Sequence, residues 1–518
     1  MRPPRIFTLV VALVFAAVVL VPVGAALLPA FLGGGSDSGA KGSVLFGPRH
    51  AGLALNSLTL ATGTTALCLL IGVALALLLG RTDLKGWRLL LALQILPVLI
   101  PPYIHAISWS RLSPLIQRLT GGEIHSLWGA IMVLSMAYFP FVSLATLAGL
   151  RSLDRSVEES ARLSRGPWAT LGRITLPLAA PHILAGGALV FILSMADFGV
   201  PDILRVRVYP IEIFIQYSAF YNEAGAAMLA LPLVALSVLA LVVLMRALAG
   251  RSYVQWGSSQ ELAERIPLGR LQAVALGFCG LVLGLAVGVP VLALVHAAAP
   301  LRDLPRILAG AFPEVSYTLL LSTGGALMAV ILGAGVAWSL ERSALGGKIP
   351  WELLALLSLA VPATSMGLGL IRIWNRPALD GLYESSIAVC MGYLARFIPF
   401  AVIFIRSGFR QIGPSVEESA WLHGRGRLHA MGSVLLPLLR PSLIAAFFVV
   451  FVLSFGELGT TLLVVPPGKE TVSLKIYNLM HYGAESSVAV LCLLVMGVIL
   501  FCSGAFLALE RRLLRRMG

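Results

Sequence analysis

Residues 55–79, LNSLTLATGTTALCLLIGVALALLL, and residues 317–340, YTLLLSTGGALMAVILGAGVAWSL, contain no charged side chain. A helix of about 20 apolar residues is long enough to cross the hydrocarbon core of a membrane, so each stretch predicts a membrane-spanning helix. Both stretches also carry a Thr-Gly pair at the same place, beginning at Thr62 and at Thr323. Apolar runs of membrane length and similarity between the two halves both extend along the rest of the chain.

The composition of the whole chain is that of a membrane protein. Of its 518 residues, 58% are hydrophobic and 12% are charged, and the mean hydropathy is +0.92. An ordinary soluble domain has about 25% charged residues, so a soluble enzyme is excluded. The formal net charge is +14, but the basic residues are scattered between apolar runs, so we expect no nucleic-acid partner. The five cysteines lie in apolar stretches without a CxxC pair and predict neither a disulfide nor a metal site.

Apolar runs of this kind predict an all-α polytopic transmembrane protein with about twelve helices. The predicted spans are residues 6–32, 55–79, 89–108, 127–149, 182–201, 226–246, 271–296, 317–340, 351–371, 386–405, 443–465 and 486–509. The first run follows Arg2 and Arg5 and could instead be a signal peptide. It is longer than the apolar core of about 7–15 residues that such peptides have, so we expect an uncleaved span.

The distribution of Lys and Arg predicts the orientation of these spans. With the N-terminus in the cytoplasm, the cytoplasmic segments hold 25 basic and 11 acidic residues, and all other segments hold 13 of each. The whole positive excess therefore lies on one side, as the positive-inside rule requires. The sequence thus predicts a multi-pass protein with cytoplasmic N- and C-termini.

The chain repeats itself at an offset of 259 to 261 residues, and the run SVEESA at Ser156–Ala161 returns unchanged at Ser415–Ala420. Further matches, in chain order, are Arg81 with Arg342, Pro101 with Pro362, Phe139–Phe141 with Ile398–Phe400, Leu176-Pro177 with Leu436-Pro437, and Ser194, Asp197 and Gly199 with Ser454, Glu457 and Gly459. Because an even number of spans returns each copy to the same side, the series predicts two parallel six-helix repeats. We expect the first repeat at residues 1–249, a cytoplasmic linker at 250–267 and the second repeat at 268–518.

The largest predicted cytoplasmic loop of each repeat follows its fourth helix. The first loop reads EESARLSRGPW at Glu158–Trp168 and the second reads EESAWLHGRG at Glu417–Gly426, and each ends in Leu-Pro before the next span. The pattern predicts a short helix with acidic residues in its first turn, small residues that allow close approach of another surface, and a glycine stop. Because the pattern occurs twice at the same place, it indicates a docking element for a partner more than a solvated linker.

These loops resemble the EAA loop of ATP-binding-cassette (ABC) importer permeases, the inner-membrane components of binding-protein-dependent transport systems. The chain resembles those with both permease halves fused, as in ferric-iron-type and thiamine-type permeases. The resemblance implies that residues 158–166 and 417–424 are coupling helices seated in two copies of a cytoplasmic ABC ATPase. The implied coupling residues are Glu158, Glu159, Ser160, Ala161 and Gly166, and Glu417, Glu418, Ser419, Ala420 and Gly424. It also implies the bacterial inner membrane as location and a periplasmic or lipid-anchored substrate-binding protein.

Two departures from the family pattern concern these loops. Ser160 and Ser419 replace the first alanine of the motif, and the first loop is one residue shorter, so its glycine is either displaced to Gly166 or replaced by Ser164.

The chain also has no GxxxxGK[ST] run, which is the phosphate-binding loop of many ATPases. We therefore expect a transport subunit that is not an enzyme and has no cofactor or metal of its own, with ATP and Mg bound by the partner ATPase.

Asp197 and Glu457 occupy equivalent positions toward the ends of the fifth and eleventh predicted helices. A carboxylate in lipid costs about 2.5–3.5 kcal/mol on insertion scales, so we expect both side chains to face the bundle interior. One hypothesis is that they line the translocation path; the other is that they cap or brace neighbouring helices. The first hypothesis includes the hydroxyl groups of Ser194, Ser454, Thr460 and Thr461.

The sequence says less about the transported solute than about the class of transporter. The run SFGELG at Ser454–Gly459, followed by PPG at Pro466–Gly468, most resembles ferric-iron permeases, so ferric iron is the expected solute, with thiamine, polyamine and molybdate as alternatives.

An ion-gradient-driven secondary transporter can also have twelve helices in two parallel halves. It needs ionisable residues inside the membrane, which are almost absent from the predicted spans, so we expect ATP-driven import by alternating access.

Overall fold

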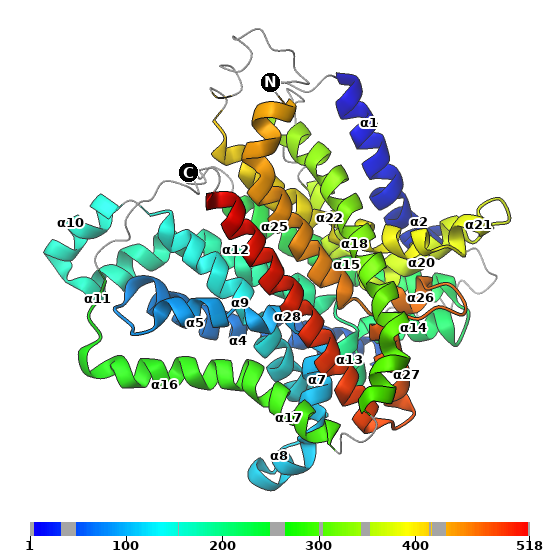
Figure 1. Ribbon diagram of the computed structural model, residues 1–518, viewed down its shortest axis with the longest axis horizontal. Coiled ribbons are helices and arrows are strands. Elements are labelled where there is room, and N and C mark those ends of the chain that lie inside the picture. The colour runs from blue at the N-terminus through cyan, green and yellow to red at the C-terminus, as the bar shows by residue number, and fades with distance from the viewer. Residues whose placement is uncertain are drawn as a thin grey trace. The chain divides into compact units, whose positions relative to one another are not determined.

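The computed structural model describes residues 5–32, 48–153, 155–248, 265–299, 304–342, 353–413, 416 and 431–515. In this part of the chain the regular structure is helical, apart from one isolated β-bridge between Thr82 and Ile266. Figure 1 labels the helices along the chain. The predicted all-α class is confirmed.

Ten helical segments within the described ranges are long and apolar enough to cross a membrane, and two bent helix pairs raise the number to twelve if each pair is one span. The ten segments are Arg5–Leu32, Arg49–Arg81, Leu127–Arg151, Pro167–Met195, Glu223–Val243, Gly269–Ala298, Leu304–Arg342, Ser386–Gln411, Gly432–Phe455 and Glu485–Phe506. The bent pairs supply the predicted third and ninth spans. The prediction of about twelve spans is therefore confirmed.

The third span of each repeat is bent at a proline. Trp87–Leu99 meets α7 (Pro102–Arg111) at 89°, and Leu353–Ala360 meets α20 (Ala363–Trp374) at 104°. The residue before each proline is extended, with ψ of 114° at Ile100 and 126° at Val361. Proline has no N–H for the helix ladder and disfavours a helical conformation in the preceding residue, so the equivalent Pro101 and Pro362 place both bends.

Two predicted spans, residues 182–201 and 443–465, are displaced from the observed helices. The chain is already helical from Pro167 and from Gly432, and α12 (Leu176–Met195) and α25 (Leu436–Phe455) end before the two repeated carboxylates. Short helices, α13 (Gly199–Ile203) and α26 (Thr461–Val464), follow the breaks. Apolar residues continue across each break, so hydropathy alone does not locate the helix ends.

Three helices of each repeat pack together in the same way. They are α4 (Pro48–Arg81), α9 (Leu127–Arg151) and α12 in the first repeat, and α18 (Leu304–Arg342), α22 (Ser386–Gln411) and α25 in the second. A Cβ on Gly72 would lie 2.8 Å from Val142 Cβ, and a Cβ on Gly333 would lie 2.9 Å from Ala401 Cβ, so both contacts require glycine. Gly72 and Gly333 are equivalent in the sequence, and the tertiary packing therefore repeats with it.

The compact units of the structure do not follow the two halves of the sequence. One unit comprises Met1–Ser38, Ile213–Leu231 and Pro300–Gly518, and the other comprises Gly39–Glu212 and Pro232–Ala299. The first span thus belongs with the second repeat, and the seventh span belongs with the first repeat. The predicted boundaries at residues 1–249, 250–267 and 268–518 describe the sequence repeat and stay a prediction.

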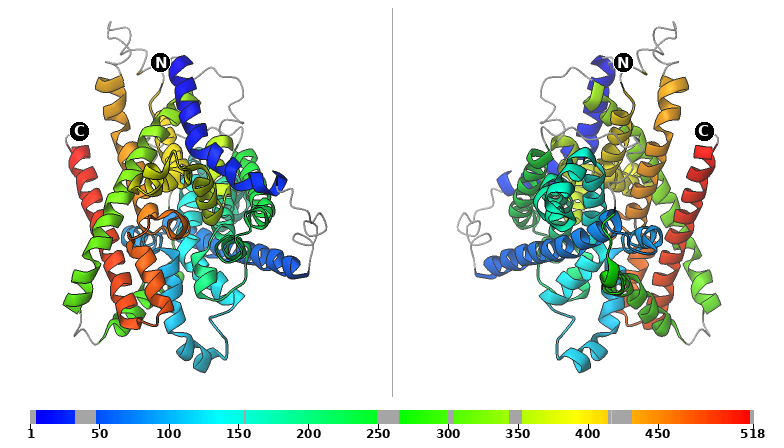
Figure 2. Two further views of the ribbon diagram at one scale, coloured as in Figure 1. Left: turned by 90° about the vertical axis from the view of Figure 1, so that its right-hand side faces the viewer. Right: turned by 90° about the vertical axis from the view of Figure 1, so that its left-hand side faces the viewer.

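Direct contacts account for this exchange of helices. In one unit, α1 (Arg5–Phe15) packs on α18 and α2 (Val21–Leu32) packs on α20 (Figure 2). A Cβ on Gly369 of α20 would lie 2.0 Å from Pro22 O, so only glycine allows this approach. In the other unit, α17 (Val289–Ala298) packs on α7. The first helix of each repeat thus packs against helices that are distant in the sequence.

Candidate functional sites

The first repeated loop forms two short helices. These are α10 (Arg155–Arg165) and α11 (Pro167–Thr170), and Gly166 between them has φ of 76°. A positive φ strains any residue with a Cβ, which explains why the helix ends at a glycine. The glycine stop of this loop is therefore Gly166, and Ser164 remains inside α10. After α11 the π-helical turn η2 (Leu171–Thr175) leads into α12.

The loop exposes three large apolar side chains. Leu163 is 92% exposed, Trp168 is 53% exposed and Val157 is 47% exposed. Ser160 is also exposed, and its Oγ donates a hydrogen bond to Ser156 O at 2.8 Å, while Glu159 and Ala161 are half-buried. Large apolar side chains that are exposed on a loop otherwise rich in charged residues favour contact with a partner.

Glu158 lies on the opposite, buried face of α10. Its Oε1 accepts a hydrogen bond from Thr175 Oγ1 at 2.7 Å, and its Oε2 lies 2.8 Å from Arg81 Nη2 in an ion pair. Only 2% of each side chain of the pair is exposed, and Arg81 Nη2 also donates to Leu150 O at 2.6 Å. Glu158, grouped by the sequence with the docking residues, thus contacts the transmembrane bundle; its coupling role stays a prediction.

The second copy of the loop is predicted to carry the equivalent coupling residues. Glu417, Glu418, Ser419, Ala420 and Gly424 lie outside the described residues. The helix ends that precede this loop do repeat the first copy, because Arg342 Nη2 donates to Phe409 O at 3.1 Å and to Ile412 O at 2.8 Å. Arg342 and Phe409 are the sequence equivalents of Arg81 and Leu150.

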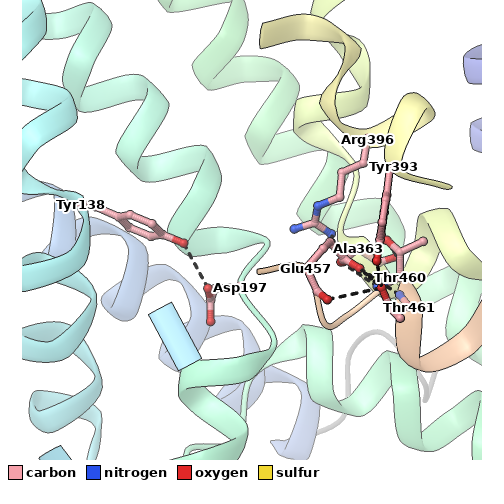
Figure 3. A network of polar contacts seen from close by, with 8 residues as sticks. All are labelled: Tyr138, Asp197, Ala363, Tyr393, Arg396, Glu457, Thr460 and Thr461. Carbon is pink, nitrogen blue, oxygen red and sulfur yellow. Dashed lines mark hydrogen bonds and ion pairs between the residues drawn. The ribbon is translucent and has the colours of Figure 1, made fainter. Parts of the chain in front are cut away.

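Asp197 connects the end of α12 to two other elements. Its Oδ1 accepts a hydrogen bond from Val200 N at 2.9 Å, and its Oδ2 accepts one from Tyr138 OH at 3.1 Å (Figure 3). The first bond satisfies an N–H at the start of α13, and the second ties this turn to α9. The half-buried carboxylate thus acts as a helix cap.

Glu457 makes the corresponding cap in the second repeat, and it is more deeply buried. Its Oε1 accepts from Thr460 N at 2.8 Å, and its Oε2 accepts from Thr461 N at 2.9 Å and from Thr461 Oγ1 at 2.7 Å (Figure 3). Arg396 Nη1 lies 3.5 Å from Oε1, with side-chain exposures of 22% for Arg396 and 2% for Glu457. Tyr393 OH and Thr461 Oγ1 share a further hydrogen bond at 3.1 Å.

The other predicted path residues are buried near these carboxylates. Thr460 Oγ1 donates to Ala363 O at 3.1 Å, which ties the turn to the start of α20. Within the described part of the chain, the buried Oγ atoms of Ser194 and Ser454 have no hydrogen-bond partner. The contacts of Asp197 and Glu457 are those of helix caps, and a role of these six residues in the translocation path stays a prediction.

The sequence reasoning missed the partners of these carboxylates. Arg396 is a charged residue inside the otherwise apolar span 386–405, and that feature could have identified it as the partner of an intramembrane acid. Tyr138 offers no such signal, because its equivalent in the second repeat is Phe397. In the described ranges, no group of three or more His, Cys, Asp or Glu side chains is arranged to hold a metal ion.

Comparison with known proteins identifies the family. The family model described as "Binding-protein-dependent transport system inner membrane component" matches residues 68–251 and again residues 349–515. The chain belongs to this family and is a fused double permease of an ABC importer, a multi-pass inner-membrane transport subunit that is not an enzyme. A permease of this family works with a substrate-binding protein and an ATPase.

Several curated relatives are similar to this chain. The Fe(3+)-transport system permease protein FbpB 2 of Haemophilus influenzae is 27% identical over 88% of this chain and 90% of its own length. The ferric transport system permease protein FbpB of Actinobacillus pleuropneumoniae is 24% identical over 86% of this chain and 70% of its own length. The molybdenum transport system permease protein ModB of Escherichia coli is 32% identical but covers 33% of this chain and 82% of its own length.

Proposed function

We propose that this permease imports ferric iron. The observation that carries the proposal is the similarity to two ferric-iron permeases along more than four fifths of the chain, through both repeats. The molybdenum permease ModB matches over only 33% of the chain, as expected for a relative that shares one permease half. Iron is cargo in this proposal, handed over by the binding protein and released into the cytoplasm.

Import is driven by ATP and proceeds by alternating access. Two copies of the ATPase, with ATP and Mg bound between their own residues, dock on α10 and on the equivalent loop at residues 417–424. The exposed apolar side chains of Val157, Leu163 and Trp168 support a docking role for the first loop. The positive excess of the segments on one side of the membrane supports cytoplasmic N- and C-termini.

Asp197 and Glu457 lie along the route of the solute in this proposal. Both carboxylates terminate a transmembrane helix and hold the following turn, so movement of that turn would change the environment of the acid. Arg396 neutralises part of the charge beside Glu457, whereas the hydrogen-bond donor from α9 to Asp197 is the neutral hydroxyl of Tyr138.

The function is tested by uptake into proteoliposomes that contain the permease and its ATPase. Binding protein loaded with radioactive ferric iron is added outside, and ATP is enclosed inside. We expect iron uptake that requires ATP, persists with ionophores that abolish ion gradients and is unaffected by excess molybdate. Uptake of molybdate instead of iron would contradict the substrate, and uptake that needs a gradient but no ATP would indicate a secondary transporter.

A further inference from the structure

Three chain segments meet at Arg81, the last residue of α4. Its side chain contacts Leu150 O at the end of α9 and forms the ion pair with Glu158 of α10. Its own carbonyl oxygen accepts a hydrogen bond from Ile266 N at 2.8 Å. One residue thus connects a transmembrane helix to the docking loop and to the segment that enters the seventh span.

The contact with residues 265–268 is extended by the turn that follows Arg81. Asp83 N donates to Ile266 O at 3.1 Å, and Leu268 N donates to Asp83 Oδ1 at 2.8 Å. Arg265 lies over the ring of Trp87, with its guanidinium carbon 4.0 Å from the ring centroid. Two backbone bonds, a side-chain bond and a cation–π contact hold this segment against the turn after α4, so the two are expected to move together.

The contacts of Glu158 link α10 to Arg81 and so to the contacts just described. An ion pair with both partners buried resists the loss of either charge, because the remaining charge would stay desolvated without compensation. Thr175 Oγ1 adds a bond to the same carboxylate from η2, one residue before α12 begins. Glu158 is therefore joined to the ends of two transmembrane helices, α4 and α12, whereas the side chains of Leu163 and Trp168 are exposed.

We propose that Glu158 is a positioning residue that, through Arg81 and Thr175, transmits movement of the docking helix α10 to α4, α12 and the segment 265–268. The inference rests on the proposed docking of the ATPase on α10. It assigns the two adjacent acids different roles: Glu158 holds the loop on the bundle from inside, and Glu159 belongs to the half-buried side nearer the partner. Loss of Glu158 should then uncouple ATP hydrolysis from transport without preventing ATPase binding.

The test compares Glu158→Gln and Thr175→Val with the matched control Thr170→Val, in the complete complex in proteoliposomes. Thr170 is equally buried, but its hydroxyl bonds to Gly166 O at 2.9 Å within its own turn and not to Glu158. Three quantities are measured: ATPase retained on the purified permease, stimulation of ATP hydrolysis by loaded binding protein, and solute imported per ATP hydrolysed.

For Glu158→Gln we expect normal ATPase retention and a fall of about fivefold or more in import per ATP and in stimulation, the scale of typical coupling between sites. Thr175→Val should change both in the same direction by a smaller factor, and Thr170→Val should change neither. Loss of ATPase retention with normal import per ATP in the remaining complexes would overturn the proposal and make Glu158 a docking contact. Unchanged ratios in Glu158→Gln and Thr175→Val would also overturn it.

Thermal unfolding of each variant separates uncoupling from misfolding. If Glu158→Gln does not fold, Thr175→Val, which keeps the ion pair, decides the question by its ratios. Failure of the proposed function is a distinct result, because the wild-type complex would then show no ATP-dependent import at all.

Discussion

Ser57 Oγ on α4 accepts a hydrogen bond from the backbone N–H of Tyr209 at 3.0 Å and so holds the first residue of α14 (Tyr209–Ser218). Thr318, the equivalent of Ser57, accepts from Val472 N at 2.9 Å and holds the first residue of α27 (Val472–His481) in the same way. Each repeat therefore fixes the helix between its last two spans to its second span through one buried hydroxyl.

We expect Thr318→Val to destabilise the protein by about 1–3 kcal/mol, because a buried backbone N–H loses its acceptor while the side-chain shape is kept. Thr318→Ser should preserve stability to within about 0.5 kcal/mol apart from the lost methyl group. Thermal unfolding in detergent measures both. A suitable control is Thr65→Val, since the Thr65 hydroxyl only donates to Ala61 O at 2.7 Å in its own helix. Equal midpoints for Thr318→Val and the control would contradict the role of this hydroxyl.

An ion pair lies beside each of these buried hydroxyls, and the positions of its basic and acidic residues are exchanged between the two repeats. Arg49 of α4 pairs with Glu212 of α14 at 3.1 Å, whereas Glu314 of α18 pairs with Lys475 of α27 at 2.6 Å. Glu314→Arg should lower stability by about 1 kcal/mol through repulsion of Lys475, and the double variant Glu314→Arg/Lys475→Glu should restore it. A double-mutant cycle of unfolding midpoints gives the coupling, and additive effects would show that the pair contributes nothing.

Glu457→Gln should destabilise the protein more than Asp197→Asn does. Glu457 accepts three hydrogen bonds and pairs with Arg396, so its neutralisation leaves a donor and a guanidinium without compensation, at a cost of about 1–3 kcal/mol. If the carboxylates also line the path, each variant slows uptake even when its amount in the membrane is normal. Normal stability together with normal uptake in both variants would exclude both roles.

If the solute is a cation, the charge at position 197 should affect its uptake. Because a fixed positive charge repels a cation where the wild-type carboxylate attracts it, Asp197→Lys should reduce iron uptake much more than Asp197→Asn. Asp197→Asn keeps an amide oxygen that accepts from Val200 N, whereas Asp197→Lys loses this acceptor, so uptake by the two variants is compared at equal amounts of folded protein. Equal uptake by the two variants at equal expression would mean that the solute does not pass this position as a cation.

Docking of the ATPase should depend on the exposed face of α10. Leu163→Asp changes a side chain that is 92% exposed, so the permease itself should unfold at its wild-type temperature while less ATPase co-purifies. We expect the groove of the ATPase that receives these acidic loops to be basic, so Glu159→Arg combined with Glu418→Arg should weaken co-purification further by placing like charges together. Retention of the ATPase at wild-type levels in all these variants would place the docking site elsewhere.

The orientation is tested by cysteine labelling in a background without the five native cysteines. A cysteine at position 259, replacing Ser259 of the linker, should react only with reagents that reach the cytoplasmic side, and a cysteine replacing Ser38 should react from outside. The reverse pattern would contradict the cytoplasmic termini and place the repeated loops on the wrong side for an ATPase.

The amino-acid sequence by itself determined the number of membrane spans, their repeat and the place of the two loops that we propose as docking elements. The spans and loops follow from residues close together in the chain, because a run of about 20 apolar residues matches the thickness of the hydrocarbon core. The bends at Pro101 and Pro362 have a local cause too, since proline has no N–H for the helix ladder, but they were not predicted from the sequence. The stop at Gly166 is equally local, although the sequence left it open against Ser164.

Two features were decided only by the tertiary structure. They are the burial of Glu158 but not of Glu159, and the packing of the first helix of each repeat with helices of the other repeat. Glu158 and Glu159 are chemically identical in the sequence. Glu158 is the buried one, and it contacts Arg81, which is 77 positions away, and Thr175 in η2. The packing of α2 on Gly369 depends on a close approach of backbones that are hundreds of positions apart. Such contacts are set by which surfaces meet after the helices assemble, and neither hydropathy nor periodicity within one segment records that choice.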